Sequence, residues 1–143
     1  MSKVSLVYWS GTGNTKAMAD YIVEGAKSAG ADIAVFEVSE ANADTVLQSD
    51  VILMGCPSMG DEVLEEESME PFMCEIEGKL AGKKVALFGS YGWGDGQWMR
   101  DWEERVQAAK ATLMADSIIV NGEPADDSAI SDLKSLGSTA ALA

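Results

Sequence analysis

Short apolar runs alternate with longer segments of helical period from one end of the chain to the other. The apolar runs are rich in β-branched residues and occupy residues 4–8, 33–36, 51–54, 85–88 and 117–120. Segments with apolar positions at helical spacing occupy residues 14–29, 44–48, 66–77 and 97–111, and a last one contains Ile130, Leu133, Leu136 and Ala140. Because each apolar run is almost continuous, the pattern is typical of parallel strands covered on both faces of a sheet.

This alternation predicts the fold class. Five strands and about five helices describe an α/β fold, a doubly wound five-stranded parallel sheet with helices on both faces. A chain of 143 residues favours the strand order 2-1-3-4-5 over a longer six-strand arrangement. No repeat or linker divides the sequence, so we expect one domain over residues 1–143. Ligands of such sheets bind at the carboxyl ends of the strands, which makes the loops after the first, third and fourth strands the candidate site.

The first of these loops directly follows a predicted strand and directly precedes a predicted helix. Its residues are Ser10, Gly11, Thr12, Gly13, Asn14 and Thr15. The glycines allow close backbone approach, the hydroxyls and the amide can donate hydrogen bonds, and the helix N-terminus adds free N–H groups and a positive partial charge. This combination favours a phosphate-binding loop over a plain capped turn. It matches neither the Walker pattern nor the dinucleotide fingerprint, because Lys16 stands where the fingerprint has its last glycine.

The other two loops carry side chains suited to a flat ligand. The loop at residues 55–62 places Met59, a polarizable side chain, beside Gly60 and outside any predicted core. The loop at residues 89–96 holds four glycines and two aromatic residues, and packing within a helix or strand does not explain rings between glycines. We expect Trp93 to stack on one face of a planar ring and Met59 to lie against the other.

The remaining tryptophans and the two cysteines have plainer interpretations. Trp98 and Trp102 are four residues apart on a predicted helix and are assigned to packing, whereas Trp9 could also pack beneath the first loop. Cys56 and Cys74 form no metal-ligand spacing, so both are interpreted as small buried hydrophobic residues rather than catalytic thiols. Isolated thiols are typical of a reducing compartment, and no apolar stretch approaches the ~20 residues of a membrane span, so we expect a cytoplasmic protein.

The charge balance excludes several functions. The chain has 24 acidic and 10 basic side chains, a net charge of -14, and no histidine. Nucleic acids and anionic lipid surfaces both require a basic face, so neither is expected as a partner, and the expected protein partner is basic. Without histidine the chain lacks the usual general base and the commonest zinc ligand, so we assign no catalytic and no metal-binding residue.

The three loops lie within the segments YWSGTGNT, CPSMGDE and LFGSYGWGDG, and with these motifs the chain resembles the short-chain flavodoxins of bacteria over essentially its whole length. The resemblance implies a flavodoxin-like fold and non-covalently bound FMN, with the FMN phosphate on residues 10–15. It implies that the flavin ring lies between the second and third loops, on Met59, Gly60, Asp61, Glu62, Ser90, Tyr91, Gly92, Trp93 and Gly94. Some relatives have a phosphate-binding serine where this chain has Pro57, and Ser58 is the residue that could replace that contact.

The resemblance also implies a function. Flavodoxins are low-potential one-electron carriers, not enzymes, and cycle between semiquinone and hydroquinone. The carbonyl of Gly60 would accept a hydrogen bond from N5 of the semiquinone after a backbone rotation that glycine makes easy. Eight acids and no base lie in residues 57–77, where they would disfavour the anionic hydroquinone and steer basic redox partner proteins to a monomeric carrier. Neutralising Glu65, Glu66 and Glu67 together is predicted to raise the semiquinone/hydroquinone potential.

Three other functions are found on similar folds, and each needs residues or loops that can be sought in this sequence. A phosphoacceptor signalling domain needs paired acids after the first strand, where this chain has Trp9 and Ser10, and an aspartate after the third, where it has Gly55 and Cys56. A low-molecular-weight phosphatase needs an arginine where Glu62 stands. An FMN-dependent NAD(P)H:quinone reductase remains the alternative, although such enzymes usually carry extra loops for a second substrate.

Overall fold

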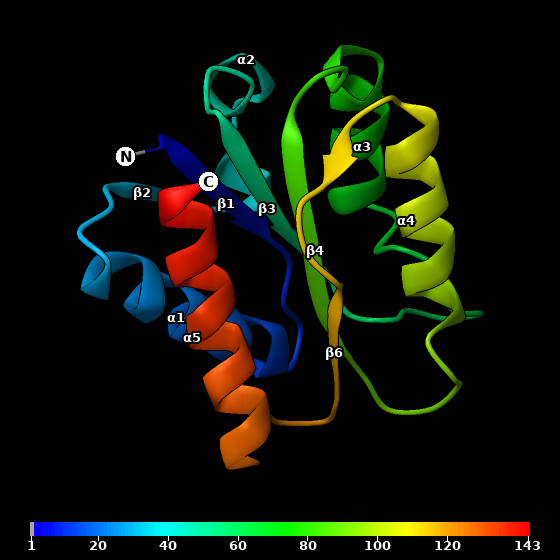
Figure 1. Cartoon of the computed structure of the whole chain (residues 1–143). Helices are drawn as coiled ribbons and strands as arrows, with labels where there is room; N and C mark the ends of the chain where they lie inside the picture. Colours follow the sequence, from blue (N-terminus) through cyan, green and yellow to red (C-terminus); the bar gives the residue numbers. More distant parts are fainter. Residues whose placement is uncertain (1) are drawn as a thin grey trace.

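The computed structural model describes residues 2–143, which form a parallel β-sheet with helices on both faces (Figure 1). The strands are β1 (Val4–Tyr8), β2 (Ile33–Glu37), β3 (Val51–Gly55), β4 (Lys84–Tyr91), β5 (Thr112–Leu113) and β6 (Ile118–Asn121). Their order is β2-β1-β3-β4-β5, and β6 also pairs with β4. The predicted fold class and the strand order 2-1-3-4-5 are therefore confirmed.

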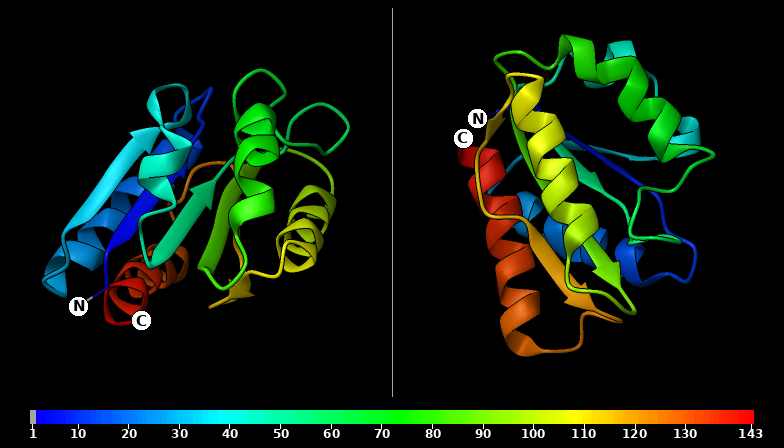
Figure 2. Two further views of the ribbon diagram at one scale, coloured as in Figure 1. Left: turned by 90° about the horizontal axis from the view of Figure 1, so that it is seen from above. Right: turned by 90° about the vertical axis from the view of Figure 1, so that its right-hand side faces the viewer.

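Helices cover the sheet in two layers (Figures 1 and 2). The α-helices are α1 (Asn14–Ser28), α2 (Ala43–Val46), α3 (Met69–Ile76), α4 (Gln97–Ala108) and α5 (Asp127–Leu142), and short 3-10 turns are η1 (Val38–Glu40) and η2 (Glu77–Lys79). Residues of α1 and α5 pack in one hydrophobic core, and residues of α2, α3 and α4 pack in the other. None of the helices in residues 2–143 is both long enough and apolar enough to span a membrane.

The central strands supply both cores in alternation, which explains their continuous apolar sequences. Within β3, Val51 and Leu53 face the core of α1 and α5, whereas Ile52 and Met54 face the core of α3 and α4. The edge strands are different. Val35 of β2 is 44% exposed and Ile119 of β6 is 38% exposed, so the prediction that every apolar run is covered on both faces is wrong at the edges, where the helix layers do not reach both sides.

The last strand of the sheet is interrupted. A single strand was predicted at residues 117–120, but β5 pairs with the start of β4, at Lys84 and Val85, and β6 pairs with its end. Residues 114–117 separate the two pieces. A two-residue strand is too short to produce a detectable alternation of apolar and polar positions, so the sequence pattern missed β5.

Each of the four helices with predicted bounds is shorter than its apolar pattern, and the difference is largest for α3 and α4. Helix α3 begins at Met69 instead of residue 66, because the segment before it forms a turn around the carboxylate of Glu65. Helix α4 ends at Ala108 instead of residue 111, and Lys110 beyond it adopts a left-handed φ of 67°. An apolar pattern reports which residues face the core, whereas the local backbone hydrogen bonds decide where a helix begins and ends.

Candidate functional site

The fold brings the three predicted loops to one end of the sheet. Parallel pairing aligns Tyr8 of β1 with Gly55 of β3, and Gly55 with Phe88 of β4, so the loops after these strands leave the sheet side by side at the lower end in Figure 1. The hydroxyls of Thr15 and Ser90 share a hydrogen bond of 3.1 Å, which joins the first loop to the third. Two segments that are 75 residues apart in the sequence are thus held together beneath the site.

The first loop leaves the N-terminus of α1 open. The residue before the helix is Gly13, which has a left-handed φ of 98° and no side chain to cap the helix. The hydroxyl oxygen of Ser10 accepts hydrogen bonds from the backbone N–H groups of Gly13 and Lys16, at 3.1 and 3.2 Å. Gly11, Thr12 and Gly13 are exposed, and Asn14 is half-buried. The hydroxyl of Ser10 therefore shapes the loop from within, while residues 11–13 lie at the surface.

Trp9 packs against this loop, which answers the question that the sequence left open. A Cβ atom added to Gly11 would lie 2.9 Å from Cη2 of the Trp9 ring, so glycine is required for this close approach. Trp9 is partly buried and packs on the core formed with α3 and α4. Its indole thus supports the first loop and forms one wall of the site.

The second loop ends in a tight hairpin. The backbone N–H of Met59 donates to the carbonyl of Val63, and that of Val63 donates to the carbonyl of Met59, each at 2.9 Å. Between them Gly60 and Glu62 have left-handed φ angles of 51° and 58°. Asp61 and Gly60 are exposed at the tip, whereas Met59 is half-buried. We refer to residues 59–63 as the flavin hairpin, after the ligand that the family resemblance implies for this loop.

Glu62 and Ser58 connect the second loop to the third. The carboxylate of Glu62 accepts a hydrogen bond of 3.1 Å from the backbone N–H of Gln97, at the start of α4, and a Cβ atom on Gly94 would collide with it. The backbone N–H of Ser58 donates to the carbonyl of Ser90 at 3.0 Å. The helix-capping role of Glu62 was not predicted, because its partner lies 35 residues away in the sequence.

The third loop presents one free aromatic ring. Trp93 is 63% exposed, between the exposed residues Gly92 and Gly94. Tyr91 instead packs against Trp98, with ring centroids 5.7 Å apart and an interplanar angle of 49°. Of the two aromatic residues in this loop, Trp93 is therefore the exposed one, and its role in stacking on a planar ligand stays a prediction. Trp98 and the neighbouring Trp102 are buried in the core, which confirms their assignment to packing.

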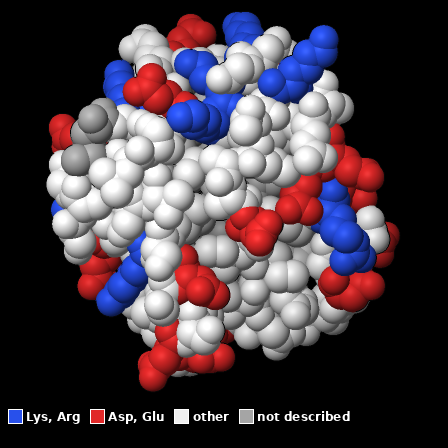
Figure 3. All heavy atoms as spheres, in the orientation of Figure 1, with Lys and Arg blue, Asp and Glu red and all other residues white. Residues whose placement is uncertain are grey.

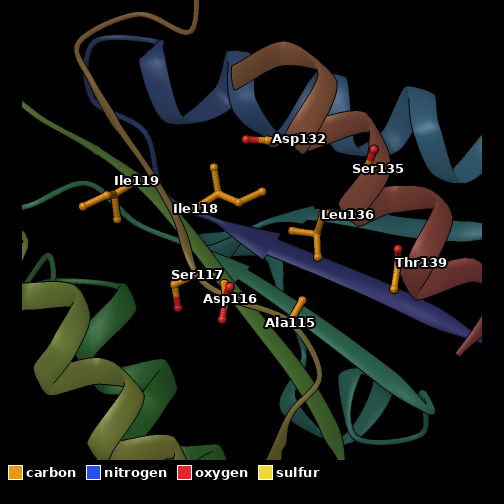
Figure 4. Close-up of a pocket in the computed structure, with 9 residues that line it drawn as sticks. All are labelled: Ala115, Asp116, Ser117, Ile118, Ile119, Asp132, Ser135, Leu136 and Thr139. Atoms are coloured by element: carbon orange, nitrogen blue, oxygen red, sulfur yellow. The ribbon is translucent and has the colours of Figure 1, made fainter. Parts of the chain in front are cut away.

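A hollow of about 550 Å³ lies between Trp9 and the second loop. It is lined by Trp9, Met59, Gly60, Asp61, Val63, Glu65, Glu66 and Glu67. Cofactor sites commonly have volumes of roughly 300–1,000 Å³, so its size is suitable. A second hollow, of about 490 Å³, lies between residues 115–119 and helix α5 (Figure 4), but no predicted site residue lines it.

The charge around the site is smaller than the sequence suggested. Arg105 of α4 forms ion pairs with Glu70, at 2.7 Å, and with Glu77, at 2.6 Å. Its hydrogen bond to Glu70 lowers the pKa of that carboxyl group below its usual value. The interpretation of residues 57–77 as acids without a base was therefore incomplete, because the base comes from another helix.

Glu65 also departs from the prediction that it acts through its charge together with Glu66 and Glu67. The side chain of Glu65 is buried, 5% exposed, whereas Glu66 and Glu67 are exposed. Its carboxylate is surrounded by backbone N–H groups. Neutralising all three residues would thus disturb the backbone before α3 as well as the electrostatic potential at the site. Only Glu66 and Glu67 are suitable for a test of charge alone.

The two cysteines differ from each other. Cys56 is buried, and burial raises the pKa of its thiol to about 12, as suits the predicted structural residue. Cys74 is exposed on α3, where its thiol donates a hydrogen bond to Glu70, so the prediction that it is buried is wrong. Within residues 2–143 no group of three or more cysteine or acidic side chains has an arrangement that could hold a metal ion.

Comparisons with known proteins agree with this architecture. A sequence profile of the flavodoxin family matches residues 6–135. The flavodoxin of Clostridium beijerinckii is 52% identical over 121 residues, which cover 85% of this chain and 88% of that protein. The flavodoxin of Megasphaera elsdenii is 48% identical over 140 residues, which cover 98% of this chain and 99% of that protein.

Solved structures agree as well. The solution structure of two-electron reduced Megasphaera elsdenii flavodoxin superposes with a TM-score of 0.90 at 48% identity, over 98% of this chain and 99% of that one. A flavodoxin from the domain Archaea superposes with a TM-score of 0.84 at 29% identity, over 98% and 96% of the two chains. These relatives are flavodoxins, so the quinone reductase alternative is not favoured. The chain belongs to the flavodoxin family, whose members are FMN-binding electron-transfer proteins and not enzymes.

Proposed function

We propose that FMN binds across the three loops and that electrons enter and leave at their exposed edge. The proposed contacts are Ser10, Gly11, Thr12, Gly13, Asn14, Thr15, Ser58, Met59, Gly60, Asp61, Glu62, Ser90, Tyr91, Gly92, Trp93 and Gly94. The observation that carries the proposal is that Ser90 joins all three loops at one end of the sheet: its hydroxyl shares a hydrogen bond with that of Thr15, and its carbonyl accepts one from the N–H of Ser58. The whole chain acts as one FMN-binding domain.

The first loop fits the phosphate of FMN. The residue before α1 is a glycine without a capping side chain, so the N–H groups of the first turn other than that of Lys16, together with the positive partial charge of the helix N-terminus, would stabilise an anion. Thr12 is exposed and its hydroxyl is free to donate to a phosphate oxygen. Ser10 accepts two hydrogen bonds within the loop and keeps its own hydroxyl proton for a further acceptor.

The second and third loops fit a planar ring. Trp93 offers an exposed aromatic face, and Met59 lies at the edge of the hollow beside Trp9. Offset stacking on such side chains stabilises a heteroaromatic ring and excludes water from it. Bound FMN supplies the electron chemistry, while the protein supplies orientation and electrostatics. The carbonyl oxygen of Gly60, at the tip of the flavin hairpin, would accept a hydrogen bond from the ring nitrogen N5 if its peptide rotated.

Exposed acids around the hollow and the two free thiols support a proposed class of redox partner and a proposed cellular compartment. Asp61, Glu66 and Glu67 are exposed around the hollow, so the edge at which a redox partner would approach is acidic. We propose that the partners are redox proteins with basic docking surfaces and that the carrier works as a monomer. Both Cys56 and Cys74 are free thiols, which is typical of the reducing cytoplasm in which we place it.

A pair of titrations tests this placement of FMN. Binding of FMN and of riboflavin, which lacks the phosphate, is followed by quenching of flavin fluorescence in the wild type and in Thr12→Val. The wild type should bind FMN more tightly than riboflavin, and Thr12→Val should weaken FMN binding by about tenfold while leaving riboflavin binding unchanged, as expected for a lost hydrogen bond to a charged group. Thr139→Val, at an exposed position of α5, is the matched control. Equal weakening of both ligands would place the phosphate elsewhere.

A further inference from the structure

Glu65 is the one buried acid of residues 57–77, with 5% of its side chain exposed. Its carboxylate accepts hydrogen bonds from the backbone N–H groups of Glu67, Ser68 and Met69, at 2.7 to 3.2 Å. These N–H groups belong to the turn before α3 and to its first residue. The negative charge is thus compensated by backbone dipoles, and the side chain fixes the start of the helix.

The backbone of Glu65 is fixed as well. Its N–H donates to the sulfur of Cys56 at 3.4 Å, and its carbonyl accepts from the N–H of Glu70 at 2.9 Å. Cys56 is itself held by β4 and α4, since its N–H donates to Phe88 and its carbonyl accepts from Nε1 of Trp98, each at 3.1 Å. The second loop is therefore held at both ends. Cys56 is bonded to β4 and α4, and Glu65 is bonded to the turn before α3 and to the start of that helix.

The part of the loop between these two anchors is also connected to the third loop through Ser58 and to the start of α4 through Glu62. It contains the flavin hairpin, which two backbone hydrogen bonds close between Met59 and Val63. One residue, the buried Leu64, separates Val63 from Glu65, so Glu65 lies directly beside the Val63 end of the hairpin. Glu65 also lines the same hollow as Met59 and Gly60.

We propose that Glu65 is a positioning residue for FMN, whose buried carboxylate holds the base of the flavin hairpin and thereby places Met59 and Gly60 against the ring. The inference rests on the proposed function, in which this hairpin contacts FMN. Glu65 acts through geometry, whereas its neighbour Glu66 is exposed and acts only through its charge. Removing the charge of Glu65 should therefore have different consequences from removing the charge of Glu66.

Glu65→Gln and Glu66→Gln, compared in the FMN-loaded protein, remove the same charge from adjacent positions. Glutamine at position 65 replaces one acceptor oxygen with an N–H₂ donor, so part of the hydrogen bonding to residues 67–69 is lost. We expect the amide protons of Met59 and Val63 to exchange with deuterium about tenfold faster in Glu65→Gln, because a charge-assisted hydrogen bond is lost. The potential of the second reduction step should shift, and that shift should persist at high salt.

Glu66→Gln is the matched control. It should leave the exchange of the flavin hairpin unchanged, and any shift of the potential should shrink as salt is added, because exposed charges are screened. If the two variants exchange at equal rates and their potential shifts have the same salt dependence, Glu65 acts by charge alone and the inference is wrong.

Two further measurements separate the possible failures. If Glu65→Gln does not fold, Cys56→Ala removes the acceptor of the Glu65 N–H without changing charge, and unchanged hairpin exchange in that variant would overturn the inference. In the wild type, adding FMN should slow exchange at Met59 and Val63. Without that protection the proposed FMN site fails together with the inference, whereas protection combined with insensitive variants rejects the role of Glu65 alone.

Discussion

At the scale of single residues, the flavin hairpin depends on a glycine with a left-handed backbone. Gly60 has a φ of 51°, and a Cβ atom added there would meet no atom within 4 Å. A side chain at this position would thus change the backbone preference without any steric clash. Left-handed geometry costs a residue other than glycine roughly 1–2 kcal/mol, and β-branched residues more, so valine would favour another conformation of the hairpin.

We predict that Gly60→Val reduces the maximal fraction of one-electron-reduced flavin during reduction, because the Gly60 carbonyl can no longer reach N5 at low cost. A spectroscopic redox titration measures this fraction. Gly82→Val is the control, since Gly82 also has a left-handed φ, of 81°, and open space around it, but lies outside the three loops. An unchanged fraction in Gly60→Val would remove the hairpin rotation from the mechanism.

At the scale of elements, the pair α1 and α5 is joined by two glycines. A Cβ atom on Gly25 would collide with the carbonyl oxygen of Lys134, and one on Gly137 would collide with the carbonyl oxygen of Ile22. The hydroxyl of Ser138 donates to the carbonyl of Gly25 at 3.1 Å. The two backbones therefore approach as closely as glycine allows, and this contact closes the core on that face of the sheet.

Gly137→Ala should lower the free energy of unfolding by about 1–3 kcal/mol, because overpacking outweighs the better helix propensity of alanine. Urea unfolding measures the difference. Ser135→Ala, at an exposed position of the same helix, should change stability by no more than about 0.5 kcal/mol. A more stable Gly137→Ala variant would show that the two helices can move apart without cost.

The sequence predicted the central elements well because buried strands produce a strong signal. All four residues predicted for the run at 51–54 lie in β3, and the predicted bounds of β1 match the observed ones. The three loops followed from the strand order and did gather at one end of the sheet. Contacts between distant residues left no such signal. The capping of α4 by Glu62 and the ion pairs of Arg105 with Glu70 and Glu77 depend on tertiary structure alone.

At the scale of the whole molecule, several lysines gather at the end of the sheet opposite the three loops. Lysines stand at the amino ends of strands, where Lys3 precedes β1, Lys84 begins β4 and Lys110 precedes β5, and Figure 3 shows a group of basic side chains along its upper edge. Exposed acids such as Glu66 and Glu67 lie at the loop end. A carrier with this distribution would turn its site toward a basic partner before contact.

Glu66→Gln combined with Glu67→Gln should raise the potential of the second reduction step. One carboxylate ~10 Å from the ring disfavours an added electron by about 20 mV at water-like dielectric, so two should contribute about 40 mV at low ionic strength. The control, Asp44→Asn with Asp132→Asn, removes two exposed charges from α2 and α5. Equal shifts in both double variants would mean that only net charge matters, not its position.

A stepwise redox titration of the FMN-loaded protein tests the central claim most directly. An electron carrier that holds the flavin at the three loops should bind one FMN and take up two electrons in separate steps, with the one-electron-reduced form accumulating between them. A single two-electron step, together with rapid turnover of NAD(P)H and quinone, would contradict the assignment as a carrier.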